Sequence, residues 1–253
     1  GAFGHIKNQV IAELERVGIT EDQVATGGLK ITTTIDMNVQ NASTDAVDGQ
    51  LASLQEDARA AAVTIDPATG GIRGYFGGNE ATGWDYANAG LQTGSTFKIF
   101  TLAAALQQGI GLDTYYSSAP YQLPGSQVVT NVDGGCGSCS IAEALKKSYN
   151  TSFLRLQDDL ENRTQDTADM AHALGIAKSL PGIDKTLSEK GGTPFEGVVL
   201  GQYQSRPLDM ASAMATLTNG GVWHQPHFVQ KVETTGGEVL YEFDDKGGER
   251  RVS

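Results

Sequence analysis

A serine and a lysine three residues apart, Ser95 and Lys98, are the first side chains whose types and spacing suggest chemistry. Residues three apart share one face of a helix, so the Lys98 amine can reach the Ser95 hydroxyl. That hydroxyl is a weak nucleophile until a base takes its proton, and a buried lysine can be the base because burial disfavours its charged form. The pair predicts acyl transfer through Ser95. The alternative for the isolated motif is a helix cap followed by a solvated lysine.

A second pair, Ser148 and Asn150, follows about fifty residues later, between two segments that are both expected to be helical. A hydroxyl and a carboxamide can relay a proton and bind a substrate amide. Alone, the pattern is more typical of an ordinary helix C-cap and N-cap. The order and spacing of the two pairs together favour a catalytic interpretation.

The segment from Ser95 to about Gln108 is predicted to be a helix that positions the first pair. Apolar residues occur nearly all round it, and a helix that is apolar on every side is a buried one. Gly109 and Gly111 end it. Its N-terminus offers free N–H groups and a positive dipole end, which can stabilise charge that develops beside Ser95.

Strands are expected near both ends of the chain. Residues 61–65 and 72–76 flank a turn that contains proline and glycine, and residues 228–232 and 239–243 flank Gly236-Gly237. Each pair of segments is therefore predicted to form a hairpin.

Helices are expected between these hairpins and near the N-terminus. Asp36 is expected to cap a helix that runs to about Leu54, and its apolar face would comprise Val39, Ala42, Ala46 and Val47. Further helices are predicted from Ser140, Asn150, Ala168 and Pro207. The pattern predicts an α+β fold, an antiparallel sheet with helices plus an all-helical subdomain of about 120 residues.

Charge and composition exclude several classes of protein. The 253 residues carry 18 basic and 30 acidic side chains, a formal charge of -12. That balance argues against nucleic-acid binding, which depends on Lys and Arg contacts to phosphate. No apolar run reaches the roughly 18 residues of a membrane span, and no signal peptide is recognisable, so either the protein is cytosolic or any membrane anchor lies outside this sequence.

The four histidines, His5, His172, His224 and His227, suggest no catalytic grouping. We expect the segment from His224 to His227 to be a surface loop. Trp84 and Tyr86 precede Ser95 and could line the cleft, although packing is their expected role. No cofactor or metal site is predicted.

The two cysteines, Cys136 and Cys139, lie in a glycine-rich loop. Two thiols make a poor zinc site, which needs four ligands. A thioredoxin-like motif would instead open a helix of a βαβ unit. A small structural disulfide in an oxidising compartment is the favoured interpretation.

Together, the two pairs resemble the active-site signature of penicillin-binding proteins and serine β-lactamases. Other segments resemble bifunctional (class A) penicillin-binding proteins, so the similarity covers nearly the whole chain: residues 27–36, 63–70, 89–95, 199–208 and 218–221. The loop cysteines resemble those of actinobacterial members. The resemblance implies that residues 1–55 are a linker after a glycosyltransferase domain missing from this sequence. Residues 56–253 would be the transpeptidase domain, with its helical subdomain at about 94–220.

What the resemblance implies is DD-transpeptidase activity at the extracytoplasmic face of the bacterial cell membrane. Ser95 would attack the penultimate D-Ala carbonyl of a peptidoglycan stem peptide, and the acyl group would pass to an amine of a neighbouring stem. Lys98 would take the Ser95 proton, Ser148 would relay a proton to the leaving nitrogen, and Asn150 would bind the substrate amide. The Ser95 N–H would supply half of an oxyanion hole. β-Lactam antibiotics would acylate the same serine.

The sequence departs from the family at its third motif, Lys-Thr-Gly. The nearest strings are Lys185-Thr186-Leu187 and Lys246-Gly247-Gly248, and neither precedes a convincing strand. In the family this motif lies downstream of where Ser253 falls, so the C-terminal strands of the sheet are expected to be absent from this chain. One hypothesis is a companion fragment that carries the third motif and is produced by cleavage near Arg250-Arg251.

Two other functions remain open. A serine β-lactamase or DD-carboxypeptidase would use water as the acceptor, but the linker-like N-terminus disfavours both, and no glutamate is obviously placed to activate a deacylating water. A β-lactam sensor or a non-catalytic scaffold domain would keep the fold without turnover.

Overall fold

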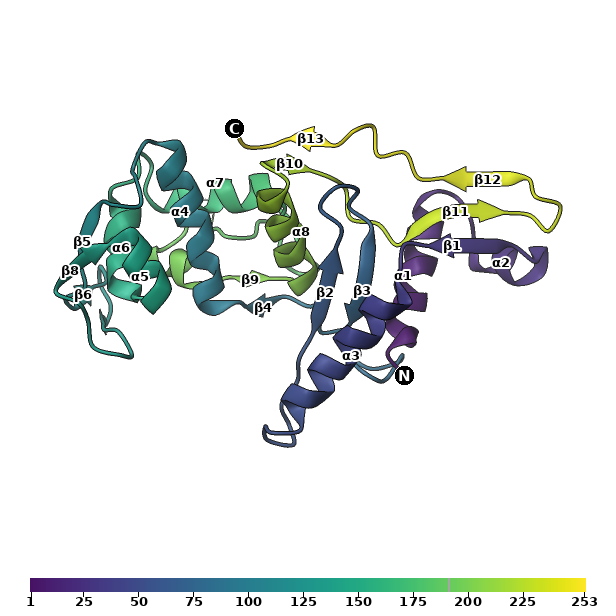
Figure 1. The fold of residues 1–253 in the computed structure, drawn as a ribbon, viewed down its shortest axis with the longest axis horizontal. Coiled ribbons are helices and arrows are strands. Elements are labelled where there is room, and N and C mark those ends of the chain that lie inside the picture. Colours follow the sequence, from purple (N-terminus) through teal and green to yellow (C-terminus); the bar gives the residue numbers. More distant parts are fainter. Residues whose placement is uncertain (191) are drawn as a thin grey trace. The chain divides into compact units, whose positions relative to one another are not determined.

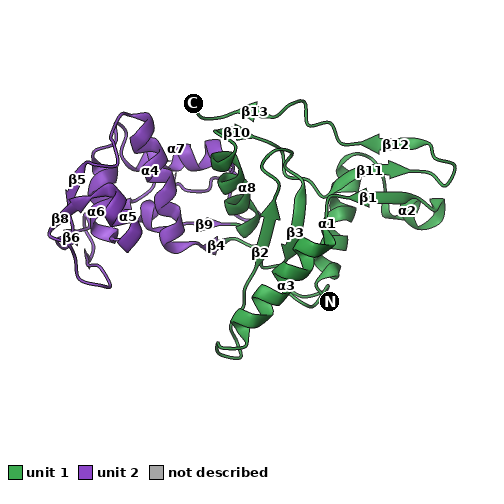
Figure 2. Ribbon diagram, viewed as in Figure 1, with its two compact units in different colours: residues 1–90, 206–253 green, residues 91–205 purple. Residues whose placement is uncertain are grey.

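The computed structural model describes residues 1–190 and 192–253. They divide into unit 1, residues 1–90 and 206–253, and unit 2, residues 91–205 (Figures 1 and 2). Unit 1 combines sheets with helices and unit 2 is mainly helical, which confirms the predicted α+β class. In these ranges no helix has both the length and the apolar character needed to cross a bilayer.

Unit 1 contains antiparallel strands and four α-helices. The strands pair in the order β1-β11-β12, in the hairpin β2-β3 and in the short ladder β10-β13, so both predicted hairpins are confirmed. The elements are α1 (Phe3–Arg16), α2 (Glu21–Gly27), β1 (Lys30–Thr33), α3 (Met37–Leu51), β2 (Ala62–Ile65), β3 (Ile72–Phe76), α8 (Pro207–Thr218), β10 (Val222–Trp223), β11 (Val229–Glu233), β12 (Val239–Glu242) and β13 (Glu249–Arg250).

The core of unit 1 joins α1 to the β2-β3 hairpin and to the β1-β11-β12 sheet. Apolar residues of α1 at helical spacing, such as Leu14, pack in one cluster with Tyr75 and Phe228, whose rings meet edge-on at 5.1 Å. The buried carboxylate of Glu13 accepts hydrogen bonds from the N–H groups of Phe228 and Val229 at 2.9 and 2.6 Å. Because a buried carboxylate needs such donors, these bonds fix α1 against β11.

Helix α3 lies across the β2-β3 hairpin (Figure 1), and Asp36 caps it as predicted. Its buried residues are Gln40 and Val47, whereas Ala42 and Ala46 are exposed, so the predicted apolar face is wrong at those two positions. The Gln40 carboxamide donates to the Tyr75 carbonyl at 2.8 Å and accepts from the Tyr75 N–H at 2.6 Å. A polar side chain therefore faces the sheet, because it supplies hydrogen bonds that the β3 backbone needs.

The segment from His224 to His227 differs from the predicted surface loop. The His227 ring is 2% exposed and stacks on Phe243 with the ring centroids 3.5 Å apart. His224 Nδ1 lies 2.6 Å from Asp245 Oδ2. An imidazole has an apolar face and polar nitrogens, so both rings find partners inside unit 1 that the sequence does not reveal.

Unit 2 is helical with three short antiparallel ladders, β4-β9, β5-β8 and β6-β7. The sequence did not predict these strands, because two or three residues are too few to show alternation. The elements are β4 (Leu91–Gln92), the 3-10 helix η1 (Gly94–Phe97), α4 (Lys98–Gln107), β5 (Tyr115–Ser117), β6 (Tyr121–Gln122), β7 (Val128–Val129), β8 (Ser138–Ser140), α5 (Ile141–Lys147), α6 (Asn150–Asp158), α7 (Thr164–Leu174), the 3-10 helix η2 (Glu196–Leu200) and β9 (Gln204–Ser205).

A buried chain of hydrogen bonds connects four helices of unit 2. Thr101 Oγ1 of α4 lies 2.8 Å from Thr167 Oγ1 of α7, which is 2.8 Å from Gln157 Oε1 of α6. Gln157 Nε2 in turn donates to the Glu196 carbonyl of η2 at 2.9 Å. Because buried polar groups are costly without partners, this hydrogen-bond network specifies the packing of α4 at Thr101, one turn beyond Lys98.

Candidate active site

Ser95 lies in η1, the 3-10 turn that leads directly into α4. The sequence predicted α-helix from Ser95 onward, whereas α4 begins at Lys98. The β4-β9 ladder holds the residues before the turn, and the buried Phe97 ring packs edge-on against Phe100 at 4.6 Å. The turn is thus anchored on both sides while Ser95 itself stays exposed.

A close approach of two glycines fixes the same turn. Gly201, just after η2, has φ 72°, and a Cβ placed on it would overlap the backbone of Gly94. Gly94, with φ 66°, also adopts the left-handed conformation that glycine tolerates. The residue before Ser95 can therefore lie against η2 only because position 201 has no side chain.

The Lys98 amine lies at the centre of the predicted residues, and the side chain is only 1% exposed. Its Nζ is 3.0 Å from Ser95 Oγ, 2.8 Å from Ser148 Oγ and 2.7 Å from Asn150 Oδ1. It also donates to the Ser148 carbonyl at 3.2 Å. The structure thus brings together all four residues that the sequence singled out.

These contacts leave a neutral Lys98 amine well suited to accept a proton. The Ser148 carbonyl and Asn150 Oδ1 can only accept, so they take two N–H groups. A neutral amine has two N–H groups, so its one lone pair is left for one of the two hydroxyls, Ser95 Oγ or Ser148 Oγ. Burial lowers the pKa of Lys98 to about 8, so part of the population is uncharged near neutral pH.

Ser148 has an unusual backbone conformation that explains how one residue makes two contacts. It is the C-cap of α5 and has φ 56° and ψ 45°, in the left-handed region. That conformation costs a non-glycine residue about 1–2 kcal/mol. It directs both the Ser148 carbonyl and its hydroxyl to Lys98. The chain then extends through Tyr149, and α6 begins at Asn150.

A cleft of about 150 Å³ opens beside Ser95. Ser148, Asn150 and the intervening Tyr149 line it together with Lys147 and residues 131–133. Residues 131–133 were not expected from the sequence to be functional. Their only signal was the turn-forming string Asn-Val-Asp-Gly, which marks a turn and not its partners.

Asn131 attaches this part of the cleft to α6. Its carboxamide donates to Thr151 Oγ1 at 2.9 Å and accepts from the Thr151 N–H at 3.1 Å. It also donates to the Ser118 carbonyl at 3.1 Å. Because Thr151 directly follows Asn150, these bonds connect the rim of the cleft to a residue that contacts Lys98.

The predicted disulfide between Cys136 and Cys139 is present, and it crosslinks the loop that follows residues 131–133. Cys139 belongs to β8 and is buried, and the Cys136 N–H donates to Ser118 Oγ at 2.8 Å. The rim is therefore held both by Ser118 and by a covalent bond.

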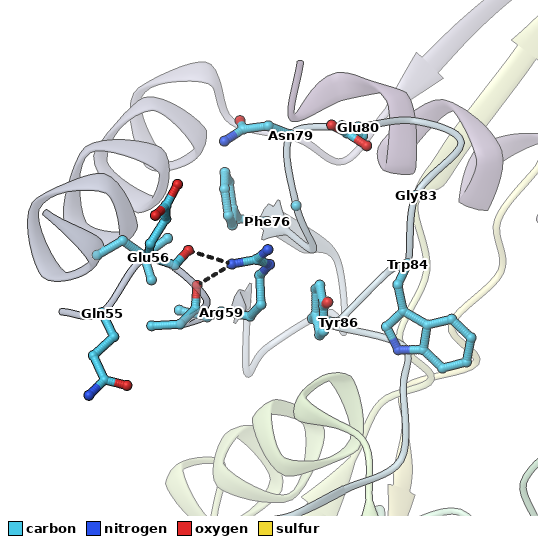
Figure 3. Close-up of a pocket in the computed structure, with 13 residues that line it drawn as sticks. Gln55, Glu56, Arg59, Phe76, Asn79, Glu80, Gly83, Trp84 and Tyr86 are labelled. Carbon is cyan, nitrogen blue, oxygen red and sulfur yellow. Dashed lines mark hydrogen bonds between the residues drawn. The ribbon is translucent and has the colours of Figure 1, made fainter.

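A larger cavity, of about 450 Å³, belongs to unit 1 (Figure 3). The side chains of Phe76, Tyr86 and Arg59 surround it, and Arg59 Nη1 donates to two backbone carbonyls. The Trp84 indole points away from these rings and is 69% exposed, so the packing role expected for Trp84 is wrong. None of the predicted catalytic residues lines this cavity.

Known proteins resemble the chain over nearly its whole length. The family model described as penicillin binding protein transpeptidase domain matches residues 60–253. Penicillin-binding protein 1A of Mycolicibacterium smegmatis is 55% identical over 256 residues, which cover 99% of this chain and 32% of the relative. Penicillin-binding protein 1A of Mycobacterium tuberculosis is 52% identical over 258 residues, 100% of this chain and 31% of the relative. The chain thus spans about a third of these curated relatives.

A solved structure also resembles the chain, in fold as well as in sequence. The PonA1 protein from Mycobacterium tuberculosis in complex with penicillin V superposes with a TM-score of 0.93 at 52% identity. The match covers 100% of this chain and 67% of that one.

Proposed function

Because the chain belongs to the penicillin-binding protein transpeptidase family, we propose that it is the acyl-transfer domain of a peptidoglycan DD-transpeptidase with Ser95 as nucleophile. The observation that carries the proposal is the 3.0 Å separation between Lys98 Nζ and Ser95 Oγ, in a site where the lysine is almost completely buried. This geometry meets the requirement for an activated serine, a base within hydrogen-bond distance.

Acylation uses the neutral form of Lys98. Ser95 Oγ attacks the carbonyl carbon of the penultimate D-Ala, and its proton moves to Lys98 Nζ. The peptide C–N bond breaks, an ester forms on Ser95, and terminal D-Ala leaves with a proton that Ser148 relays from Lys98. The 2.8 Å distance between Lys98 Nζ and Ser148 Oγ supports this relay.

Asn150 serves two partners in this proposal. Its Oδ1 accepts from Lys98 and holds the amine in place. Its Nδ2 has no hydrogen-bond partner among residues 1–190 and 192–253 and can donate to a substrate carbonyl. The position of Asn150 on the cleft wall supports that second role.

Transfer to an amine completes the reaction. The acceptor nitrogen attacks the ester carbonyl, a new amide bond forms, and the bond to Ser95 Oγ breaks as that oxygen regains a proton. Peptidoglycan stem peptides would be both donor and acceptor.

β-Lactams would open on the same serine, and the adduct would hydrolyse slowly. The match to a protein solved with penicillin V supports this part of the proposal.

The mycobacterial relatives support a wider assignment. We propose that residues 1–55 are the linker after a glycosyltransferase domain, that residues 56–253 belong to the transpeptidase domain, and that the protein acts at the extracytoplasmic face of the cell membrane. A companion fragment with the third motif remains a prediction from the sequence, and intact-mass analysis of the purified protein tests it.

Mass spectrometry of the intact protein after penicillin treatment tests the main proposal. We expect one lasting adduct on Ser95, none in Ser95→Ala, and acylation slowed at least about 100-fold in Lys98→Met, since general-base catalysis contributes that much or more. An adduct elsewhere would exclude Ser95 as nucleophile. Rapid release would favour a β-lactamase, and a lasting adduct without crosslinking would favour a sensor or scaffold.

A further inference from the structure

We propose that Val132 and Asp133 bind the acceptor amine at the rim of the cleft, with its ammonium group at Asp133 and its alkyl chain on Val132. The inference rests on the proposed function, because an acceptor site is needed only if the Ser95 ester passes to an amine. It assigns a role to the two rim residues that the acylation step does not use.

Both residues line the cleft that contains Ser95. Val132 is 96% exposed, so almost none of its surface is used for packing within the protein. A single exposed valine is ordinary on a protein surface. Its position on the wall beside the nucleophile makes it available to the methylene groups of a bound substrate.

The segment that carries the two residues is fixed before substrate arrives. Asn131 makes three hydrogen bonds to Thr151 and Ser118, and it forms an isolated β-bridge with Gly134, which closes the turn. The Cys136–Cys139 disulfide follows two residues after the turn. Because little conformational freedom is left to lose, weak contacts to substrate give more net binding.

The Asp133 carboxylate offers a position for a cation at the rim of the cleft. Among the residues that the structure describes, none forms an ion pair or hydrogen bond with the Asp133 carboxylate. Lys147 also lines the cleft, and within the described part of the chain it forms no ion pair with Asp133. An unpaired carboxylate attracts an ammonium group, and the alkyl chain of that group can pack on Val132 as lysine stems pack on apolar surfaces.

The acceptor ammonium loses two protons during the transfer. The amine arrives at Asp133 as an ammonium and must lose one proton before it attacks, and neutral Lys98 is the nearest base in the site. The nitrogen then bonds to the ester carbonyl and loses a second proton as the amide forms. One proton returns to Ser95 Oγ and the other leaves to solvent.

The test uses the intact protein, a small thioester that acylates Ser95, and two acceptors, pentylamine and hydroxylamine. Pentylamine is cationic and aliphatic, whereas hydroxylamine is small and neutral. We expect Asp133→Asn to lower kcat/KM for pentylamine about fivefold, the effect of losing an exposed ion pair of favourable geometry. We expect Val132→Ser to lower the same quantity about threefold, as partial loss of apolar contact requires.

Hydroxylamine transfer and the rate of penicillin acylation should stay within about twofold of wild type in both variants. Asp113→Asn, which removes an exposed carboxylate of unit 2 outside the cleft lining, is the matched control and should leave pentylamine use unchanged. High salt should weaken pentylamine use by wild type and not by Asp133→Asn.

Wild-type use of pentylamine by Asp133→Asn, with normal penicillin acylation, would overturn this acceptor site and leave the proposed function intact. Failure of wild-type Ser95 to form any adduct would instead overturn the proposed function, and the acceptor site with it.

Discussion

Asn150 Oδ1 lies 2.7 Å from Lys98 Nζ, closer than the 3.0 Å that separates the same amine from Ser95 Oγ. The neutral carboxamide thus holds the lysine without adding a charge. A carboxylate at the same position would keep the acceptor oxygen but stabilise the ammonium form, because an opposite charge at this distance raises a lysine pKa.

We therefore expect Asn150→Asp to slow penicillin acylation at pH 7 by about tenfold or more, since a pKa shift of about one unit changes the free-base fraction tenfold. Raising the pH should restore much of the rate, because Lys98 then deprotonates despite the carboxylate. Asn150→Leu removes the oxygen without adding charge, so its rate should rise with pH around about 8, as in wild type, whereas the Asn150→Asp rate should rise at a higher pH. Equal pH profiles for the two variants would contradict a charge effect on Lys98.

The wild-type acylation rate should itself rise with pH around a midpoint of about 8. Burial lowers the pKa of Lys98 to about 8, so the amine is mostly protonated below that value and mostly free above it. Because the free amine is the base, the rate increases as the pH rises through this value and then levels off. Stopped-flow acylation by a chromogenic cephalosporin measures it. A rate that stays flat between pH 6 and 9 would exclude Lys98 as the titrating base.

Gly201 offers a third test, at a residue outside the catalytic motifs. A side chain there would overlap the Gly94 backbone, so Gly201→Ala should displace the Ser95 turn and abolish acylation. Gly125 also has positive φ, 63°, but nothing lies within 4 Å of its Cβ position. Gly125→Ala should therefore cost about 1 kcal/mol of stability from backbone strain alone and acylate normally.

Thermal unfolding shows whether either glycine variant fails to acylate simply because it is no longer folded. A folded Gly201→Ala protein that acylates at the wild-type rate would show that the close contact with Gly94 does not position Ser95.

The sequence predicted those parts of the site that depend on local spacing. Ser95 and Lys98 are three residues apart, and their contact follows from helical geometry, although the first turn is a 3-10 turn. The resemblance to class A penicillin-binding proteins, and to actinobacterial members, is confirmed by the family match and the mycobacterial relatives. The helix cap at Asp36 was also predictable, because its signal lies within three residues.

Contacts between distant residues could not be predicted in this way. Gln40 faces β3 because its carboxamide forms two hydrogen bonds with the Tyr75 backbone, and the periodicity of α3 does not predict this contact. The bonds from Asn131 to Thr151, and the approach of Gly201 to Gly94, depend on tertiary packing. Gln40 and Asn131 satisfy backbone groups of a segment distant in the sequence, whereas the missing side chain of Gly201 leaves room for one.

The Cys136–Cys139 bridge should affect acylation through the rim of the cleft. Reduction frees the loop that follows Asn131, while the hydrogen bonds from Asn131 to Thr151 still hold the rim to α6. We therefore expect reduction to slow β-lactam acylation of Ser95 only modestly, by about twofold to fivefold, as the loss of one of two restraints implies.

The measurement is the rate of acylation by penicillin before and after reduction of the disulfide, with the reduction verified by thiol labelling. Cys136→Ser with Cys139→Ser is the control, since it should match the reduced protein and no longer respond to reductant. Unchanged acylation after complete reduction would mean that the bridge stabilises the loop without positioning Asn150 or its neighbours.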